Sequence, residues 1–112
     1  MTHHVAVTLS RTGRLSYPER TVVNAGDKLI WKFSSEDDNK IRWTVYFHHG
    51  SPFIKEPGYP HRFEAFEVAR NVQLGPFSAD EPGDYKYGLK AENAVSEAKL
   101  ADDDPRLIVQ RS

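Results

Sequence analysis

Alternating apolar and polar residues, interrupted by short turn sequences, run through most of the chain. Val5, Val7 and Leu9 alternate in the first such stretch, and the segment IRWTVYF at residues 41–47 repeats the pattern. Successive side chains on a β-strand point to opposite faces, so a period of two predicts strands with one dry face and one wet face. Several such strands separated by turns predict an all-β antiparallel sandwich.

We expect about seven strands in this sandwich. They cover residues 5–9, 20–24, 28–33, 41–47, 71–77, 84–90 and 105–110. Residues 48–59 contain two prolines and two glycines and predict a long loop. A short helix is expected near residues 60–70, opened by proline, or near 91–101, where alanines and a valine fall at helical spacing.

Length and charge limit the functions open to the chain. Its 112 residues fit a single domain, 1–112. A net charge of -1 provides no field that attracts nucleic acid or an anionic membrane, so neither is an expected partner. The absence of cysteine excludes disulfides and thiolate metal sites. The opening MTHHVAVTLS lacks the pattern of a signal peptide, so we expect a cytoplasmic protein, although a trimmed secreted or periplasmic chain would have the same sequence.

Three segments resemble the cupredoxins, the family of blue-copper proteins. They are VVNAGDKLIWKF, then WTVYF, then EPGDYKYGLK leading to DDPRLIVQ, and the resemblance runs from about Thr21 to Gln110. It implies a Greek-key sandwich. The segment DEPGDYKYG also resembles the tyrosine corner of immunoglobulin-like sandwiches, in which the hydroxyl of Tyr85 bonds upstream backbone. The three segments together favour the cupredoxin-like form.

The resemblance also implies where copper ligands would lie. The family has a histidine at the place of Trp43, a cysteine at Leu89 and a second histidine near Glu92. Copper in such sites prefers thiolate and imidazole, which these three residues do not offer. The resemblance therefore predicts the fold and argues against electron transfer. Alternation from Tyr85 through Tyr87 to Leu89 puts these residues on one face and predicts that Leu89 packs in an apolar core; the alternative is that Leu89 is exposed as part of a binding surface.

Other residues suggest candidate binding sites. His48 and His49 in a loop, with His61, form an alternative metal site, and we expect instead that they are surface histidines. Phe53 and Tyr59 lie in the long loop and either fold back as a lid or form a contact patch. With Trp43, Glu92 and the two adjacent histidines, they make up the predicted binding residues.

No catalytic set emerges from the sequence. Glu64 and Glu67 would share a face of a helix, but no histidine partner or glycine-rich loop is tied to them. We therefore expect no enzyme and no cofactor. The predicted function is a metal-free cupredoxin-like module that binds a protein partner or a small ligand and is able to form a homo-oligomer. The alternative is a diverged metal-binding protein that uses His48, His49 and His61.

Overall fold

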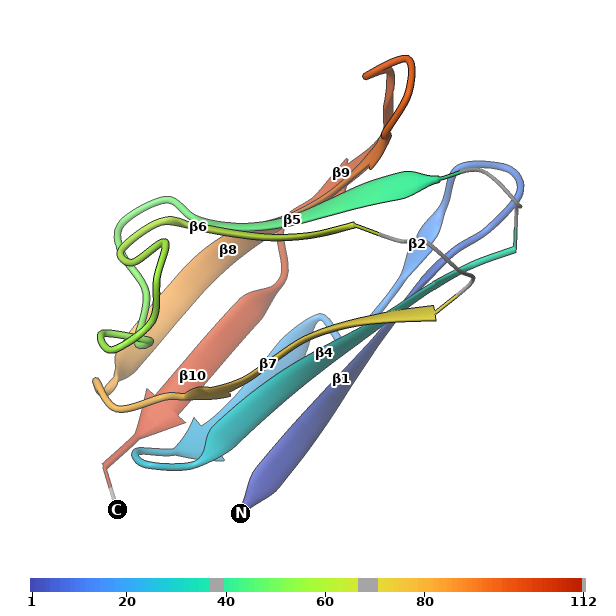
Figure 1. The fold of residues 1–112 in the computed structure, drawn as a ribbon. Coiled ribbons are helices and arrows are strands. Elements are labelled where there is room, and N and C mark those ends of the chain that lie inside the picture. Colours follow the sequence, from blue (N-terminus) through green and yellow to red (C-terminus); the bar gives the residue numbers. More distant parts are fainter. Residues whose placement is uncertain (37–39, 67–70, 112) are drawn as a thin grey trace.

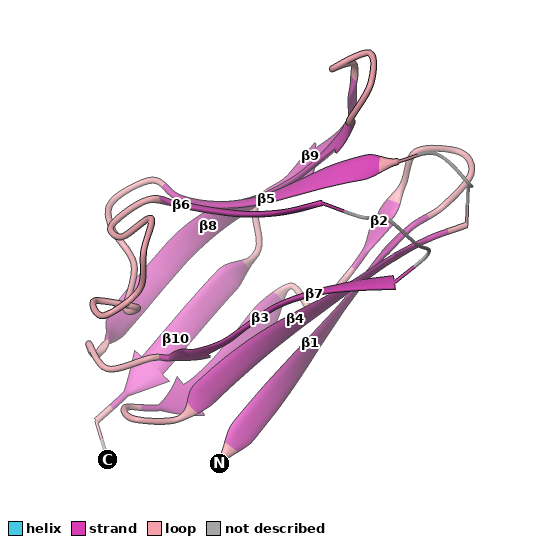
Figure 2. Ribbon diagram, viewed as in Figure 1, coloured by secondary structure: helices cyan, strands magenta, loops and turns pink. Residues whose placement is uncertain are grey.

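The computed structural model describes residues 1–36, 40–66 and 71–111, and these residues form strands and turns without a helix (Figure 2). The strands are β1 Thr2–Leu9, β2 Leu15–Ser16, β3 Arg20–Asn24, β4 Lys28–Ser35, β5 Ile41–Phe47, β6 Arg62–Phe66, β7 Asn71–Ser78, β8 Gly83–Asn93, β9 Lys99–Asp103 and β10 Arg106–Gln110. The all-β prediction is confirmed. β2, β6 and β9 are additional to the seven strands expected.

The strands form two facing sheets (Figure 1). One sheet has the order β2-β1-β4-β7, and the other has the order β3-β10-β8-β5-β6, with β9 also paired to β8. The sheets are mixed rather than purely antiparallel, because β1 pairs with β4 and β10 with β3 in parallel. Each parallel pair joins strands that are distant in sequence. The turn signals between consecutive strands do not predict such pairs.

The core between the sheets follows the predicted alternation. Trp31 and Phe33 on β4 face Trp43 and Phe47 on β5 from the opposite sheet, and all four are buried. Phe33 stacks on Trp43 with ring centroids 4.7 Å apart. Since burying a large apolar side chain is worth roughly 1.5–3 kcal/mol, these rings are a main source of stability.

Neither predicted helix forms in the described residues. Residues 62–66 form β6, an edge strand, and residues 67–70 lie outside the described part of the chain. In the 91–101 segment, Asn93 accepts hydrogen bonds at its side-chain oxygen from the backbone N–H groups of Val95 and Ser96, at 2.9 and 3.0 Å. This local bonding makes a turn between β8 and β9 and competes with helix formation. Val95 at the turn is 81% exposed, so the alanines and valine at helical spacing do not form a buried helix face.

The tyrosine-corner contact is present. The hydroxyl of Tyr85 donates to the backbone oxygen of Glu81 at 2.8 Å. Burial raises the pKa of Tyr85, so the phenol stays a donor. This bond fixes the turn before β8.

Among the described residues there is no helix long and apolar enough to cross a membrane.

Candidate functional site

Core packing and ion pairs occupy the three positions at which the sequence resemblance implies copper ligands, Trp43, Leu89 and Glu92. Trp43 and Leu89 are fully buried, which confirms the prediction that Leu89 packs in the core. The Glu92 carboxylate lies 3.7 Å from the Lys90 ammonium and 3.8 Å from Nε of Arg42. An indole, an isobutyl group and a paired carboxylate do not fit a metal centre built on thiolate and imidazole. Trp43, predicted as a binding residue, therefore presents no surface to a ligand.

The long loop over residues 48–61 folds back on the core. Phe53 is fully buried, and its ring packs edge-on against Trp31 at 5.6 Å and against Phe47 at 5.7 Å. It closes one end of the sandwich and cannot belong to a contact patch, since its large apolar ring gains more from the core than from solvent. Tyr59 is 47% exposed and remains at the surface.

The three candidate histidines lie in two different places. His48 Nε2 lies 3.5 Å from a carboxylate oxygen of Asp104, whereas His49 lines a groove beside the tyrosine corner. The His61 ring nitrogen Nδ1 is 2.7 Å from the backbone oxygen of Phe47. Within the described ranges of the chain, no group of three or more His, Cys, Asp or Glu side chains is placed to hold a metal ion. Glu67, the predicted partner of Glu64, lies outside the described residues.

A small hollow on the outer face of the larger sheet brings several polar side chains together. We call it the Gly88 hollow, and its volume is about 150 Å³. Its lining comes from β5, β6, β8 and β9 and from the start of the long loop: Thr44, Tyr46, His48, Arg62, Gly88, Lys90 and Asp102. In Figure 1, β5 and β6 lie side by side along the edge of this sheet, next to β8.

The hollow exists because a glycine interrupts a row of side chains. Tyr46 on β5 pairs with Arg62 on one side and with Gly88 on the other. A Cβ atom at Gly88 would lie 3.7 Å from an Asp104 carboxylate oxygen and 3.8 Å from His48 Nε2, which are ordinary van der Waals distances. The missing side chain therefore leaves room that a methyl group would partly fill without strain.

Aromatic rings support one wall of the hollow. Tyr46 is 37% exposed, and the His61 ring stacks on it with centroids 5.8 Å apart. The His48 ring approaches Tyr46 edge-on at 5.3 Å. Two of the three histidines of the predicted alternative metal site thus contact the same tyrosine, and this arrangement holds the ring at the rim.

Thr44 is the most informative residue of the lining. It lies between Trp43 and Val45, which are buried in the core, so strand alternation directs Thr44 to the outer face. It is nevertheless only 3% exposed. Its hydroxyl oxygen has no hydrogen-bond partner among the protein atoms of the described residues. A buried hydroxyl without a partner is unfavourable, and in a folded protein such a group calls for an explanation.

Charged groups of both signs surround the hollow. Arg62 Nε donates to a Glu64 carboxylate oxygen at 2.8 Å, and Lys90 follows Gly88 on the same face of β8. Asp102 on β9 pairs with Lys90 in the sheet register. Sequence reasoning did not select these residues. The one indication was a glycine inside a strand, which often marks a close approach of another group to the backbone.

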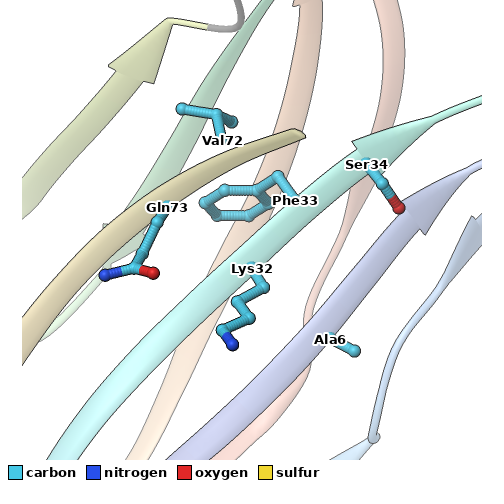
Figure 3. Close-up of a pocket in the computed structure, with 6 residues that line it drawn as sticks. All are labelled: Ala6, Lys32, Phe33, Ser34, Val72 and Gln73. Atoms are coloured by element: carbon cyan, nitrogen blue, oxygen red, sulfur yellow. The ribbon is translucent and has the colours of Figure 1, made fainter. Parts of the chain in front are cut away.

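Two larger hollows have no buried polar group like the Thr44 hydroxyl, which lacks a hydrogen-bond partner among the described residues. One lies over β1, β4 and β7, has a volume of about 480 Å³ and is lined by Ala6, Lys32, Phe33, Ser34, Val72 and Gln73 (Figure 3). Its Ser34 hydroxyl already pairs with Thr8 at 3.2 Å. In the other, beside the tyrosine corner, Arg106 and Asp84 form an ion pair at 3.2 Å. Neither lining includes a buried polar side-chain atom that lacks a partner among the described residues.

Comparison with protein-family models and with curated proteins finds no match. Solved structures do match. Auracyanin A, a blue copper protein from Chloroflexus aurantiacus, has a TM-score of 0.56 and 14% identity over 98% of this chain and 100% of its own. Auracyanin B gives 0.54 and 11% over 97% and 88%.

A chain of a heme-copper terminal oxidase dimer also matches, with a TM-score of 0.54 and 11% identity over 97% of this chain, which spans 64% of that longer chain. At these identities the likeness concerns the fold alone. It agrees with the two facing mixed sheets described above. The protein is therefore a cupredoxin-like β-sandwich, and in the part of the chain that the structure describes no group of three or more His, Cys, Asp or Glu side chains is placed to hold a metal ion.

Proposed function

We propose that this protein is a binding module that takes up a small polar ligand in the Gly88 hollow, and that it does not transfer electrons through copper. The single observation that carries the proposal is the buried Thr44 hydroxyl without a protein partner at the hollow. A ligand that bonds this hydroxyl would satisfy it. The proposal assigns binding rather than catalysis to the site.

The energetic argument rests on what an unpaired hydroxyl costs. Leaving a buried donor or acceptor unsatisfied costs about 1–3 kcal/mol. A ligand that forms a hydrogen bond with the Thr44 hydroxyl would offset part of this free energy. The hydroxyl would therefore be fully satisfied only when the ligand is bound. A purely structural threonine at a site this buried would be expected to bond the backbone or a neighbouring side chain.

The position of the hollow supports the same function. Thr44 and Gly88 lie on β5 and β8, which pair with each other over seven residues and are flanked by further strands on both sides. Groups held on central strands keep their geometry better than groups on loops, so little ordering is required when a ligand binds. In small-molecule sites, a few convergent polar groups fix the orientation of the ligand.

The test is a titration with five small probes: glycine, acetate, methylammonium, ethylene glycol and urea. Each is added to ¹⁵N-labelled protein, and the amide signals of Thr44, Gly88 and Lys90 are followed. We expect at least one probe to shift these three signals in a saturable manner. The Gly88→Ala variant, in which the added methyl meets ordinary van der Waals contacts, should fold with unchanged stability and lose most of the response.

Two results would overturn the proposal. In one, none of the five probes shifts the amides around the hollow at concentrations of up to tens of millimolar. In the other, the probe that binds does so equally well to Gly88→Ala, which would place its site elsewhere on the protein.

A further inference from the structure

We propose that the ligand of the Gly88 hollow is a small zwitterion, with an ammonium group and a carboxylate a few atoms apart, as in an α-amino acid. This inference rests on the proposed function and specifies its ligand class. Three features support it: the signs of the charges around the hollow, their places on the sheet, and the size of the space.

The first feature is a balance of charges. The lining holds two cations, Arg62 and Lys90, and one carboxylate, Asp102. A second carboxylate, Asp104, stands 3.5 Å from His48 and close to the open space over Gly88. An anion would be attracted by the cations and repelled by the aspartates, and a cation would meet the reverse. A guest that carries both signs gains from both groups, since complementary charge determines which partner a site prefers.

The second feature is the separation of Arg62 from Asp102 across the sheet, with Lys90 opposite Asp102 between them. The strand order across the hollow is β6, β5, β8 and β9, with Arg62 on β6 and Asp102 on β9. Neighbouring strands are about 4.8 Å apart, so the backbones that carry these two residues are about 14 Å apart. Arg62 and Asp102 thus line opposite sides of the hollow, and a short dipolar ion between them can meet an opposite charge at each end.

The third feature is size. A hollow of about 150 Å³ is smaller than the pockets of about 300–1,000 Å³ that hold drug-sized ligands, so it suits only a small molecule. The amino-carboxylate group of an α-amino acid has five non-hydrogen atoms. It would lie in the hollow with its carboxylate towards Lys90 and the Thr44 hydroxyl and its ammonium towards the aspartates. The amino-acid side chain would then project outward beside the exposed ring of Tyr46.

The existing ion pairs do not remove these charges from the site. Nε of Arg62 donates a hydrogen bond to the Glu64 carboxylate, and the two terminal nitrogens of the guanidinium take no part in this bond. The ammonium of Lys90 is 3.7 Å from Glu92, a distance longer than a good hydrogen bond. Each cation therefore keeps donors that a carboxylate could accept.

The experiment compares four of the probes at low ionic strength: glycine, acetate, methylammonium and ethylene glycol. Affinities are measured from the amide shifts of Gly88 and Thr44. We expect glycine to bind at least about tenfold more tightly than either single-charge probe, because it alone makes charge-assisted bonds at both ends. Ethylene glycol should bind most weakly.

Charge variants give the matched control. Lys90→Gln and Asp102→Asn should each lower the affinity for glycine about tenfold. Lys86→Gln should leave it unchanged. Lys86 lies two residues from Gly88 on the same strand, and lines the groove by the tyrosine corner instead. Arg62→Gln provides a second cation variant if Lys90→Gln proves unstable.

The outcomes separate the inference from the proposed function. If acetate, methylammonium or ethylene glycol binds the hollow as tightly as glycine, the zwitterion inference is wrong and the binding function stands. Unchanged glycine affinity in Lys90→Gln, Arg62→Gln and Asp102→Asn would also overturn the inference alone. If no probe shifts the amide of Gly88, or if Gly88→Ala binds glycine normally, both proposals fail.

Discussion

Replacing Leu89 with alanine tests whether this residue, where the sequence resemblance implies a copper-binding cysteine, stabilises the fold as part of its core. Leu89 is fully buried on β8, where it pairs with Val45 on β5 and with Asp103 on β9. Substitution of a core leucine by alanine costs about 2–5 kcal/mol, from lost transfer free energy and from the cavity that remains. Because strands hold Leu89 from both sides, the cavity cannot collapse easily, and we expect a loss of about 3 kcal/mol or more.

The assay is urea denaturation followed by tryptophan fluorescence, since Trp31 and Trp43 are both buried in the native state. The midpoint should fall while the slope with denaturant stays constant, which would identify a change in stability rather than in the unfolded state. The matched control is Leu100→Ala on β9, where the leucine is 36% exposed and the expected change is below about 0.5 kcal/mol. A loss below about 0.5 kcal/mol for Leu89→Ala as well would refute the packing argument.

Further predictions concern the hollow, pH and copper. Thr44→Val should stabilise the ligand-free protein by about 1 kcal/mol, because it removes an unsatisfied hydroxyl. Thr8→Val breaks a hydrogen bond to Ser34 and should destabilise the protein by about 1 kcal/mol. If chemical denaturation shows that both variants change the stability in the same direction, the prediction is wrong. Burial raises the pKa of Tyr17 to about 12 and that of Tyr87 to about 12. The unfolded chain ionises first, so stability should be complete below pH 10 and fall as the pH rises towards 12; a flat stability profile over that range would contradict the assignment. Leu89→Cys should give no intense visible band with Cu²⁺, and the appearance of such a band would show that imidazole ligands are available after all.

Much of the sandwich could be predicted because alternation is a local property. The apolar positions of β4 and β5, including Trp31 and Trp43, are buried as their period of two requires. Leu89 was also placed correctly, from its spacing to Tyr87. The parallel pairs and β6 could not be predicted in this way, because they depend on segments that are far apart in sequence or rich in turn residues.

The candidate site was predicted only in part. Sequence reasoning selected His48 and His61, and both lie against Tyr46 at the edge of the hollow. It did not find Thr44 or Gly88, because their importance comes from the register of β5 on β8 and not from any motif. Phe53 was placed among the binding residues, but composition alone could not show that the loop returns its ring to the core.

The burial of Trp43 and Leu89 and the existence of the hollow depend on the same pairing of β5 with β8. Trp43 and Thr44 are neighbours on β5, so the strand that directs the indole into the core must direct the hydroxyl to the outer face. A shift of one residue between the strands would exchange the two faces, and the buried rings oppose it strongly. The apolar core at Trp43 and Leu89 therefore fixes the register that places Thr44 opposite Lys90 and Tyr46 opposite Gly88 on the outer face. It follows that Leu89→Ala should weaken glycine binding and also lower the stability of the fold. Thr44→Val should weaken glycine binding but raise the stability. The opposite changes in stability distinguish a residue that supports the site from one that contacts the ligand.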